Sequence, residues 1–171
     1  MPRRAIVSFP ELPEASPIFE LRRRFDPLAE LIPPHITLVF PFDSELTTEQ
    51  LRDHVHRSVR GLAPFAVRLS QITGSEGEYL FLNVKLGNDA IIALHDRLYT
   101  GPLKRHLAVE HTFTPHLTVG RIADPVAFRD ALALARTLDV QLDVQIADVS
   151  SYLIDAVGSR RIELATPLAS S

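Results

Sequence analysis

The feature that most constrains the fold of this chain is a duplicated pentapeptide. Pro34-His35-Ile36-Thr37-Leu38 and Pro115-His116-Leu117-Thr118-Val119 share the pattern Pro-His-aliphatic-Thr-aliphatic. A single His-x-Thr tripeptide is a weak signal, since roughly 0.4 copies are expected by chance in a chain of this composition. Two copies that agree at five positions, each inside a segment with the composition of a strand, indicate a duplicated structural unit.

Strand geometry divides each pentapeptide between two faces. Successive side chains of a β-strand point to opposite sides, so His35 and Thr37 share one face while Ile36 and Leu38 share the other. The second copy divides in the same way. The proline before each histidine suits the first position of a strand, where no ladder hydrogen bond is needed. If the two strands pack about a pseudo-two-fold axis, the two His-Thr pairs face each other across a cleft.

Around the two pentapeptides the chain alternates between strand and helix patterns. Strand, helix, His-Thr strand, helix and hairpin are followed by helix, His-Thr strand, helix and strands, which indicates one α+β unit used twice. No linker separates the halves, so we expect a single domain of two lobes over residues 1–171, with largely antiparallel sheets and outer helices. The expected strands cover residues 3–9, 35–40, 64–72, 79–86, 115–121, 140–147, 149–155 and 160–165. The expected helices run from Pro17 to Asp26, from Thr47 to Gly61, from Asn88 to Leu98 and from Pro125 onwards.

Composition limits the classes of function. The net charge is −3 and the sequence pI is near 6.1, whereas a protein that binds long nucleic acid through its backbone usually carries a basic surplus. We therefore expect a nucleotide or an RNA end as the partner rather than a long duplex. The chain has no cysteine, which excludes disulfides and Cys-ligated zinc and fits a cytoplasmic protein. No apolar stretch approaches the roughly 18 residues of a membrane span, so no membrane partner is expected.

The chemistry of the repeated residues points to phosphate esters. In an imidazole pair that flanks a phosphate, a neutral histidine takes a proton from the nucleophile and a protonated one gives a proton to the leaving oxygen. The hydroxyls of Thr37 and Thr118 can donate hydrogen bonds to nonbridging phosphate oxygens, where charge develops in the transition state. Such a site needs neither a metal nor a cofactor. The pattern therefore predicts a phosphoesterase site with His35 and His116 as its catalytic residues.

At these residues the sequence resembles the 2H phosphoesterase superfamily, the two-histidine enzymes that include 2′-5′ RNA ligase-like proteins and cyclic nucleotide phosphodiesterases. The family signature of two His-x-Ser/Thr-x motifs is met by residues 35–38 and 116–119. The resemblance extends over nearly the whole chain, and residues 33–42 look like the bacterial 2′-5′ RNA ligase-like branch. It implies a bilobal α+β fold with a central cleft, and metal-independent hydrolysis of 2′,3′-cyclic phosphates or related linkages.

Carried over by position, the resemblance implies that His35 and His116 are the acid and the base, and that Thr37 and Thr118 orient the phosphate. For hydrolysis the preferred assignment has His116 activating water and His35 protonating the leaving oxygen. The reverse assignment stays open at this stage. The natural substrate, the 2′ or 3′ product and the oligomeric state stay open as well.

One single arginine and one run of three arginines are further candidates for phosphate or RNA binding. Arg121 follows Thr118 by three positions, so strand alternation places it on the opposite face unless the chain bends at Gly120. The run of three arginines at 22–24 forms either a basic rim for RNA or, in the simpler interpretation, a solvated helix face.

Aromatic residues near the motifs are candidates for stacking on a base. Phe42 and Phe113 are the best placed, ahead of Phe40 and Tyr79, because they lie beside the two pentapeptides. Core packing is the alternative for each of them. The other histidines have no recognised zinc spacing, so no metal site is expected.

Two other functions are compatible with the sequence. One is a non-catalytic nucleotide- or RNA-binding module on the same fold, although retention of both histidines and both threonines favours catalysis. The other is a phosphodiesterase for a cyclic phosphate metabolite that is not RNA, which the acidic balance of the chain keeps open.

Overall fold

The computed structural model describes residues 1–169, and residues 170–171 lie outside the described part. Every strand and α-helix expected from the sequence is present, together with one additional 3₁₀-helix. The strands are β1 (Arg3–Ser8), β2 (Ile36–Asp43), β3 (Phe65–Ser75), β4 (Tyr79–Leu86), β5 (His116–Arg121), β6 (Gln141–Ile146), β7 (Asp148–Ile154) and β8 (Arg160–Pro167). The helices are α1 (Pro17–Phe25), α2 (Thr48–Val59), α3 (Asn88–Leu98), the 3₁₀-helix η1 (Gly101–His106) and α4 (Pro125–Arg136).

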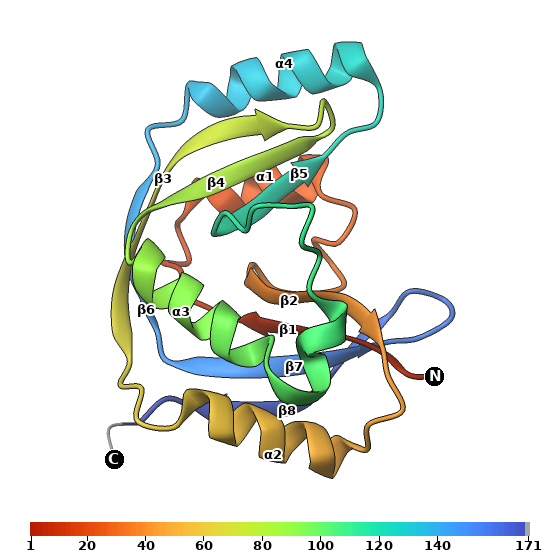
Figure 1. The fold of residues 1–171 in the computed structure, drawn as a ribbon. Helices are drawn as coiled ribbons and strands as arrows, with labels where there is room; N and C mark the ends of the chain where they lie inside the picture. The colour runs from red at the N-terminus through yellow and green to blue at the C-terminus, as the bar shows by residue number, and fades with distance from the viewer. Residues whose placement is uncertain (170–171) are drawn as a thin grey trace.

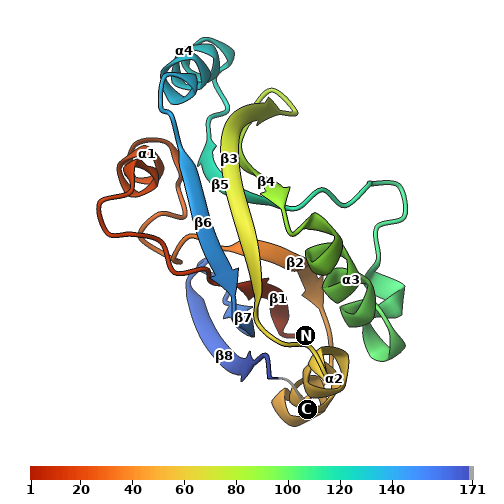
Figure 2. The same cartoon turned by 90° about the vertical axis from the view of Figure 1, so that its left-hand side faces the viewer.

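The strands form one curved antiparallel sheet in the order β6-β3-β4-β5-β2-β1-β7-β8 (Figures 1 and 2). A single residue pair, Ile36 with Leu117, joins β2 to β5, whereas every other neighbouring pair of strands shares at least five residue pairs. The sheet therefore consists of lobe 1 (β2, β1, β7 and β8) and lobe 2 (β5, β4, β3 and β6). The expected bilobal α+β fold is confirmed, and its two lobes meet at the two His-Thr strands within one continuous sheet.

The duplication expected from the sequence is visible in the order of the elements. Strand-helix-strand-helix-strand occurs once as β1-α1-β2-α2-β3 and again, with η1 inserted, as β4-α3-β5-α4-β6. The third strand of the first unit leaves its lobe, because β3 pairs with β4 and β6 in lobe 2. The C-terminal hairpin of β7 and β8 completes lobe 1.

The helices tie the two lobes together. Helix α1 follows a strand of lobe 1 but packs against β5 of lobe 2, and α3 follows a strand of lobe 2 but packs against β2 of lobe 1. Gly120 permits the first of these contacts, because an added Cβ would lie 3.0 Å from the Cβ of Phe25. Among the described residues, no helix is both long and apolar enough to cross a membrane.

Three of the four α-helices begin with the side-chain caps that their sequences suggest. Thr47 and Gln50 form a reciprocal capping box at α2, and Asp124 accepts a hydrogen bond from the Ala127 amide at α4. Helix α3 begins without a side-chain cap, since Asn88 is its first residue and Gly87 is its cap at φ 89°. A Cβ at Gly87 would lie 2.7 Å from a backbone oxygen, so only glycine fits this sharp entry.

Candidate active site

The two His-Thr strands lie next to each other at the centre of the sheet. His35 immediately precedes β2, and His116 is the first residue of β5. Because Ile36 pairs with Leu117 in an antiparallel register, the histidines stand close to the one strand pairing that the lobes share within residues 1–169. The topology thus brings together two segments that are 81 residues apart, as the duplicated pattern predicts.

Burial confirms the division of each pentapeptide between two faces. The aliphatic positions are at most 1 % exposed and belong to the main core: Ile36, Leu38, Leu117 and Val119. The polar positions are all partly exposed: His35, Thr37, His116 and Thr118. Each strand therefore buries its aliphatic face and offers an imidazole and a hydroxyl on the other face.

The two imidazoles are held by the same kind of hydrogen bond. Nδ1 of His35 lies 2.8 Å from the carbonyl oxygen of Pro33, and Nδ1 of His116 lies 2.8 Å from the carbonyl oxygen of Thr114. A carbonyl oxygen only accepts, so Nδ1 must carry the proton and donate it. This fixes the tautomer of both rings and leaves Nε2 of each as the nitrogen free to exchange a proton with a substrate.

The surroundings of both rings favour the neutral imidazole. Burial lowers the pKa of His35 and of His116 below the ordinary histidine value, and the hydrogen bonds to the two carbonyls offset part of this. At His35 the pKa is also lowered by the charge of Arg22, raised by that of Asp26 and lowered by that of His116. The imidazole of His116 thus lies close enough for its charge to act on His35.

Aromatic contacts differ between the two histidines. The ring of Phe81 on β4 stacks on His116, with centroids 3.6 Å apart and planes 21° apart. His35 instead meets the edges of Phe9 and Tyr152, with centroids 6.0 and 6.2 Å away. His116 is therefore fixed by a face-to-face contact, whereas His35 sits between two edge-on rings.

A bulge in β5 changes the face on which Arg121 lies. Thr118 pairs with Phe81 and Gly120 pairs with Leu80, so β5 has one more residue than β4 over this stretch. The extra residue reverses the alternation, and Arg121 comes to pair with Tyr79 on the face that carries Thr118. Simple alternation placed Arg121 on the opposite face, and the irregularity at Gly120 is the exception that the sequence allowed for.

Arg121 is already engaged on this face. Its Nε lies 3.2 Å from a carboxylate oxygen of Glu78, and its guanidinium lies 5.2 Å from the centroid of the Tyr79 ring. About half of the side chain remains exposed. A guanidinium that is held in place but open to solvent can meet an anionic group next to Thr118.

The two aromatic residues favoured from the sequence are not open stacking platforms. Phe42 is 4 % exposed and lies in the core, where it contacts the ring of His106. Phe113 is half-buried and stacks on His95, with centroids 3.9 Å apart. Phe42 shares the parity of Ile36 and Leu38 along β2, so strand alternation places it on the core face, and proximity in sequence to His35 did not predict proximity in space.

The three arginines of α1 have separate roles. Arg22 is buried and forms an ion pair with Asp26 at 2.8 Å, so it is neither an RNA rim nor part of a solvated face. Arg23 and Arg24 are exposed, as the solvated-face interpretation predicts. Burial of Arg22 follows from its position on the side of α1 that faces the protein, which the run of like charges concealed.

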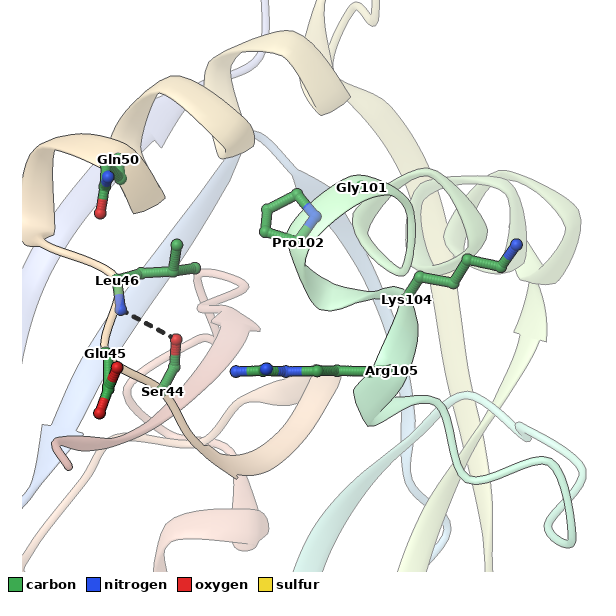
Figure 3. A pocket seen from close by; sticks show the side chains of 8 residues that line it. All are labelled: Ser44, Glu45, Leu46, Gln50, Gly101, Pro102, Lys104 and Arg105. Carbon is green, nitrogen blue, oxygen red and sulfur yellow. Dashed lines mark hydrogen bonds between the residues drawn. The ribbon is translucent and has the colours of Figure 1, made fainter.

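A separate hollow of about 810 Å³ lies away from the two motifs (Figure 3). It is lined by the turn after β2, by Gln50 of α2 and by η1, and the Arg105 side chain extends across it towards Ser44. Ser44 follows the last residue of β2, whereas His35 precedes its first, so on the order of 25 Å of strand separates them. None of the motif residues lines this hollow. Among residues 1–169, no three His, Asp or Glu side chains are grouped as metal ligands.

Sequence reasoning missed several residues that contact the histidines. Phe81 alternates with Tyr79 along β4, so its face was readable from the sequence, but its place beside His116 depends on the strand register. Tyr152 reaches His35 only because β7 joins lobe 1 from the far end of the chain. The spacing of Arg22 and Asp26 by four residues was a readable signal for an ion pair on one helix face.

Comparison with known families gives a match over most of the chain. A model of the family described as the 2′-5′ RNA ligase superfamily matches residues 9–155. A protein of Halalkalibacterium halodurans, named "Putative phosphoesterase", is 32 % identical over 121 residues, which cover 68 % of this chain and 68 % of that protein.

Solved structures share the fold at low sequence identity. The structure of TT0787 of Thermus thermophilus is 20 % identical, has a TM-score of 0.63 and covers 99 % of both chains. The structure of E. coli LigT in its apo form is 20 % identical, has a TM-score of 0.58 and covers 98 % of this chain and 95 % of that one. Other structures of E. coli LigT are complexes with NADP⁺, ATP and 3′-AMP.

Proposed function

The chain belongs to the 2′-5′ RNA ligase superfamily, and on this premise we propose that it is a phosphoesterase that opens 2′,3′-cyclic phosphates of nucleotides or RNA ends. One observation carries the proposal. Two imidazoles at the start of adjacent central strands are anchored through Nδ1 in the same way, and each has an Nε2 free for proton transfer. Binding alone does not require such a pair, whereas acid–base catalysis does.

The proposed reaction is an in-line hydrolysis. Neutral His116 takes a proton from water through Nε2 as the water oxygen forms a bond to phosphorus. The bond from phosphorus to the 2′ or 3′ oxygen breaks, and protonated His35 gives its Nε2 proton to that oxygen. The products are a phosphomonoester and a free hydroxyl, with the proton moved from His35 to His116 in net terms. Exchange with solvent restores the starting state.

The threonines and Arg121 have proposed roles in charge stabilisation. The hydroxyls of Thr37 and Thr118 donate to the nonbridging oxygens, one from each lobe, where negative charge grows in the transition state. Arg121 lies on the same face of β5 as Thr118 and supplies positive charge to the phosphate or to a neighbouring one. Neither role needs a bound metal.

A nucleotide-like substrate is supported by the relatives and by the surface of lobe 2. E. coli LigT, which shares the fold, is seen in complexes with ATP, NADP⁺ and 3′-AMP. In this chain the motif face of lobe 2 carries Tyr79 and Phe81, both partly exposed and in contact with each other, at 5.8 Å between centroids. Tyr79 takes over the base-stacking role that the sequence favoured for Phe42 and Phe113, because it lies beside Arg121 on the motif face.

The proposal is tested by hydrolysis of 2′,3′-cyclic nucleotides with excess EDTA. We expect wild-type turnover to survive EDTA, and His35→Ala and His116→Ala each to lose about 10²- to 10⁴-fold in kcat. His56→Ala is the matched control, because His56 is an exposed histidine of α2 outside the motifs. Equal turnover in all variants contradicts the two-histidine mechanism. Abolition by EDTA points to a metal enzyme.

A second candidate is a phosphodiesterase for a small cyclic phosphate that is not RNA. The net charge of −3 favours a small substrate over a polyanion. The values of kcat/KM for 2′,3′-cyclic nucleotides, for RNA ends and for small cyclic phosphates that are not RNA separate the two candidate functions. Nucleotide binding without turnover of any of these supports a non-catalytic binding module instead.

A further inference from the structure

A buried ion pair at the end of α1 has no role in the reaction proposed above. Nε of Arg22 lies 2.8 Å from Oδ2 of Asp26, and the two side chains are 4 % and 5 % exposed. An ion pair this deeply buried is weak evidence for added stability, because the cost of desolvation is comparable to the attraction. Its presence therefore calls for a more specific explanation.

The pair fixes the segment that leads into the first motif. Nη2 of Arg22 donates to the carbonyl oxygen of Ile32 at 3.0 Å, and Oδ1 of Asp26 accepts from the Leu28 amide at 2.9 Å. The two side chains thus hold both ends of residues 28–32. The next residue, Pro33, provides the carbonyl that fixes Nδ1 of His35.

The pair also stands between the two lobes. Helix α1, which carries Arg22, packs on β5 of lobe 2. The segment that Arg22 holds packs on lobe 1, where Leu28 and Ile32 join a cluster with Val7 and Tyr152 that is separate from the main core. Through this ion pair, a helix that packs on lobe 2, the lobe of His116, holds the segment of lobe 1 that leads to His35.

We infer that Arg22 and Asp26 are positioning residues for His35, and that their ion pair aims its imidazole at the phosphate held between the lobes. The inference rests on the proposed role of His35 as a proton donor or acceptor. No contact between the pair and the substrate is implied, since the pair acts through the backbone of residues 28–33. A shift of about 1 Å in a catalytic group costs on the order of 10²-fold in rate, so this support matters.

The charges of the pair give it an electrostatic signature. His35 faces Arg22 and Asp26 from the α1 side, His116 from β5 and the neutral phenol of Tyr152 from β7. The cation lowers the pKa of His35 and the anion raises it, so they oppose each other in the intact pair. Asp26→Asn leaves the cation and should lower the pKa of His35, whereas Arg22→Gln leaves the anion and should raise it.

The first experiment is an NMR titration of the histidine ring signals, with His35 assigned from the His35→Ala spectrum. We expect shifts of opposite sign in Asp26→Asn and Arg22→Gln, and no shift in the matched controls Glu20→Gln and Arg23→Gln. The control residues form an exposed ion pair on the same helix. Shifts of the same sign, or none in folded variants, overturn the inference. The titration requires no activity, so it is independent of whether the proposed reaction is correct.

The second experiment is kinetic and uses Arg22→Lys, which keeps the charge and disturbs folding less than a neutral residue. A lysine ammonium cannot hold Asp26 and the Ile32 carbonyl in the bidentate geometry of the guanidinium. With a 2′,3′-cyclic nucleotide we expect kcat to fall about 10-fold or more while KM and the pKa of His35 stay near wild type. Unchanged kcat overturns the positioning role. If the wild type does not hydrolyse the cyclic nucleotide, the proposed function is contradicted, whereas the NMR result remains valid.

Discussion

The two lobes present the same tripeptide in different surroundings. In lobe 1, His35 follows a segment, residues 28–32, that packs on the face of the sheet, and a buried ion pair holds that segment in place. In lobe 2, His116 lies against the open stacked ring of Phe81, and the same face continues to Tyr79 and Arg121. Lobe 1 therefore encloses its histidine, whereas lobe 2 offers a partly exposed aromatic and cationic surface beside its own.

This difference suits a pair of groups with opposite tasks. An acid and a base must be in different protonation states at the start of the reaction, so identical surroundings would not serve them well. Charges of both signs act on His35, while burial and one carbonyl hydrogen bond are the influences on the pKa of His116. The comparison predicts that lobe 1 mainly positions its histidine and that lobe 2 mainly recognises the substrate.

After the two histidines, the largest expected effect comes from the two threonines. Thr37→Val and Thr118→Val remove one hydroxyl each with little change in shape, and we expect each to lower kcat by about 10²-fold, as for other transition-state donors. Thr112→Val, at an exposed position outside the motifs, should have no effect. A rise in KM alone in either motif variant would show that its hydroxyl binds the ground state instead.

Arg121 tests whether lobe 2 recognises the substrate. Arg121→Gln removes a charge-assisted hydrogen bond, and we expect KM for a cyclic nucleotide to rise about 10-fold. Glu78→Gln frees the guanidinium from its partner and should leave KM unchanged or lower it. Steady-state kinetics on both variants checks this pair of outcomes. An unchanged KM in Arg121→Gln would remove lobe 2 as the source of anion recognition.

Phe81 tests how His116 is held. Phe81→Leu removes the stacked ring, and we expect kcat to fall about 5-fold, which corresponds to roughly 1 kcal/mol of aromatic contact, with KM retained. Phe40→Leu is the control, because Phe40 is an exposed aromatic on β2, which is separated from β4 by β5. A higher KM with unchanged kcat would mean that Phe81 contacts the substrate rather than supports the histidine.

The smallest effect concerns stability. Burial lowers the pKa of both histidines in the folded state, so the unfolded chain binds protons first as the pH falls below the ordinary histidine value of about 6.5. Folding stability should therefore decrease on acidification from that point, through the lowered pKa values. Urea unfolding at a series of pH values measures this, and the dependence should weaken in a double His35→Ala, His116→Ala variant. An equal slope in that variant would assign the effect to other groups.

The sequence predicted the features that depend on local pattern. Alternation placed Ile36 and Leu117 in the core and both histidines on the opposite face, because each strand has one buried side. Turn and cap residues located α2 and α4 to within about two residues, since Thr47 and Asp124 make the hydrogen bonds that their types favour.

Features that depend on pairing between distant segments were not predictable in this way. The bulge that turns Arg121 to the motif face exists only in relation to β4. The shifts that leave Phe40 exposed, although it has the parity of the buried Ile36 and Leu38, exist only in relation to β1. The depth of the Arg22–Asp26 pair depends on how α1 packs on β5, an element about 90 residues further along the chain. Register and packing, rather than residue type, decided these positions.

The pH dependence of kcat/KM for a 2′,3′-cyclic nucleotide in excess EDTA is the most direct test of the two-histidine account. It predicts a bell-shaped profile for the wild type, with one group acting protonated and the other unprotonated. His35→Ala should remove one limb of the residual profile and His116→Ala the other. Loss of the same limb in both variants, or a wild-type profile with no bell, would contradict acid–base catalysis shared between the lobes.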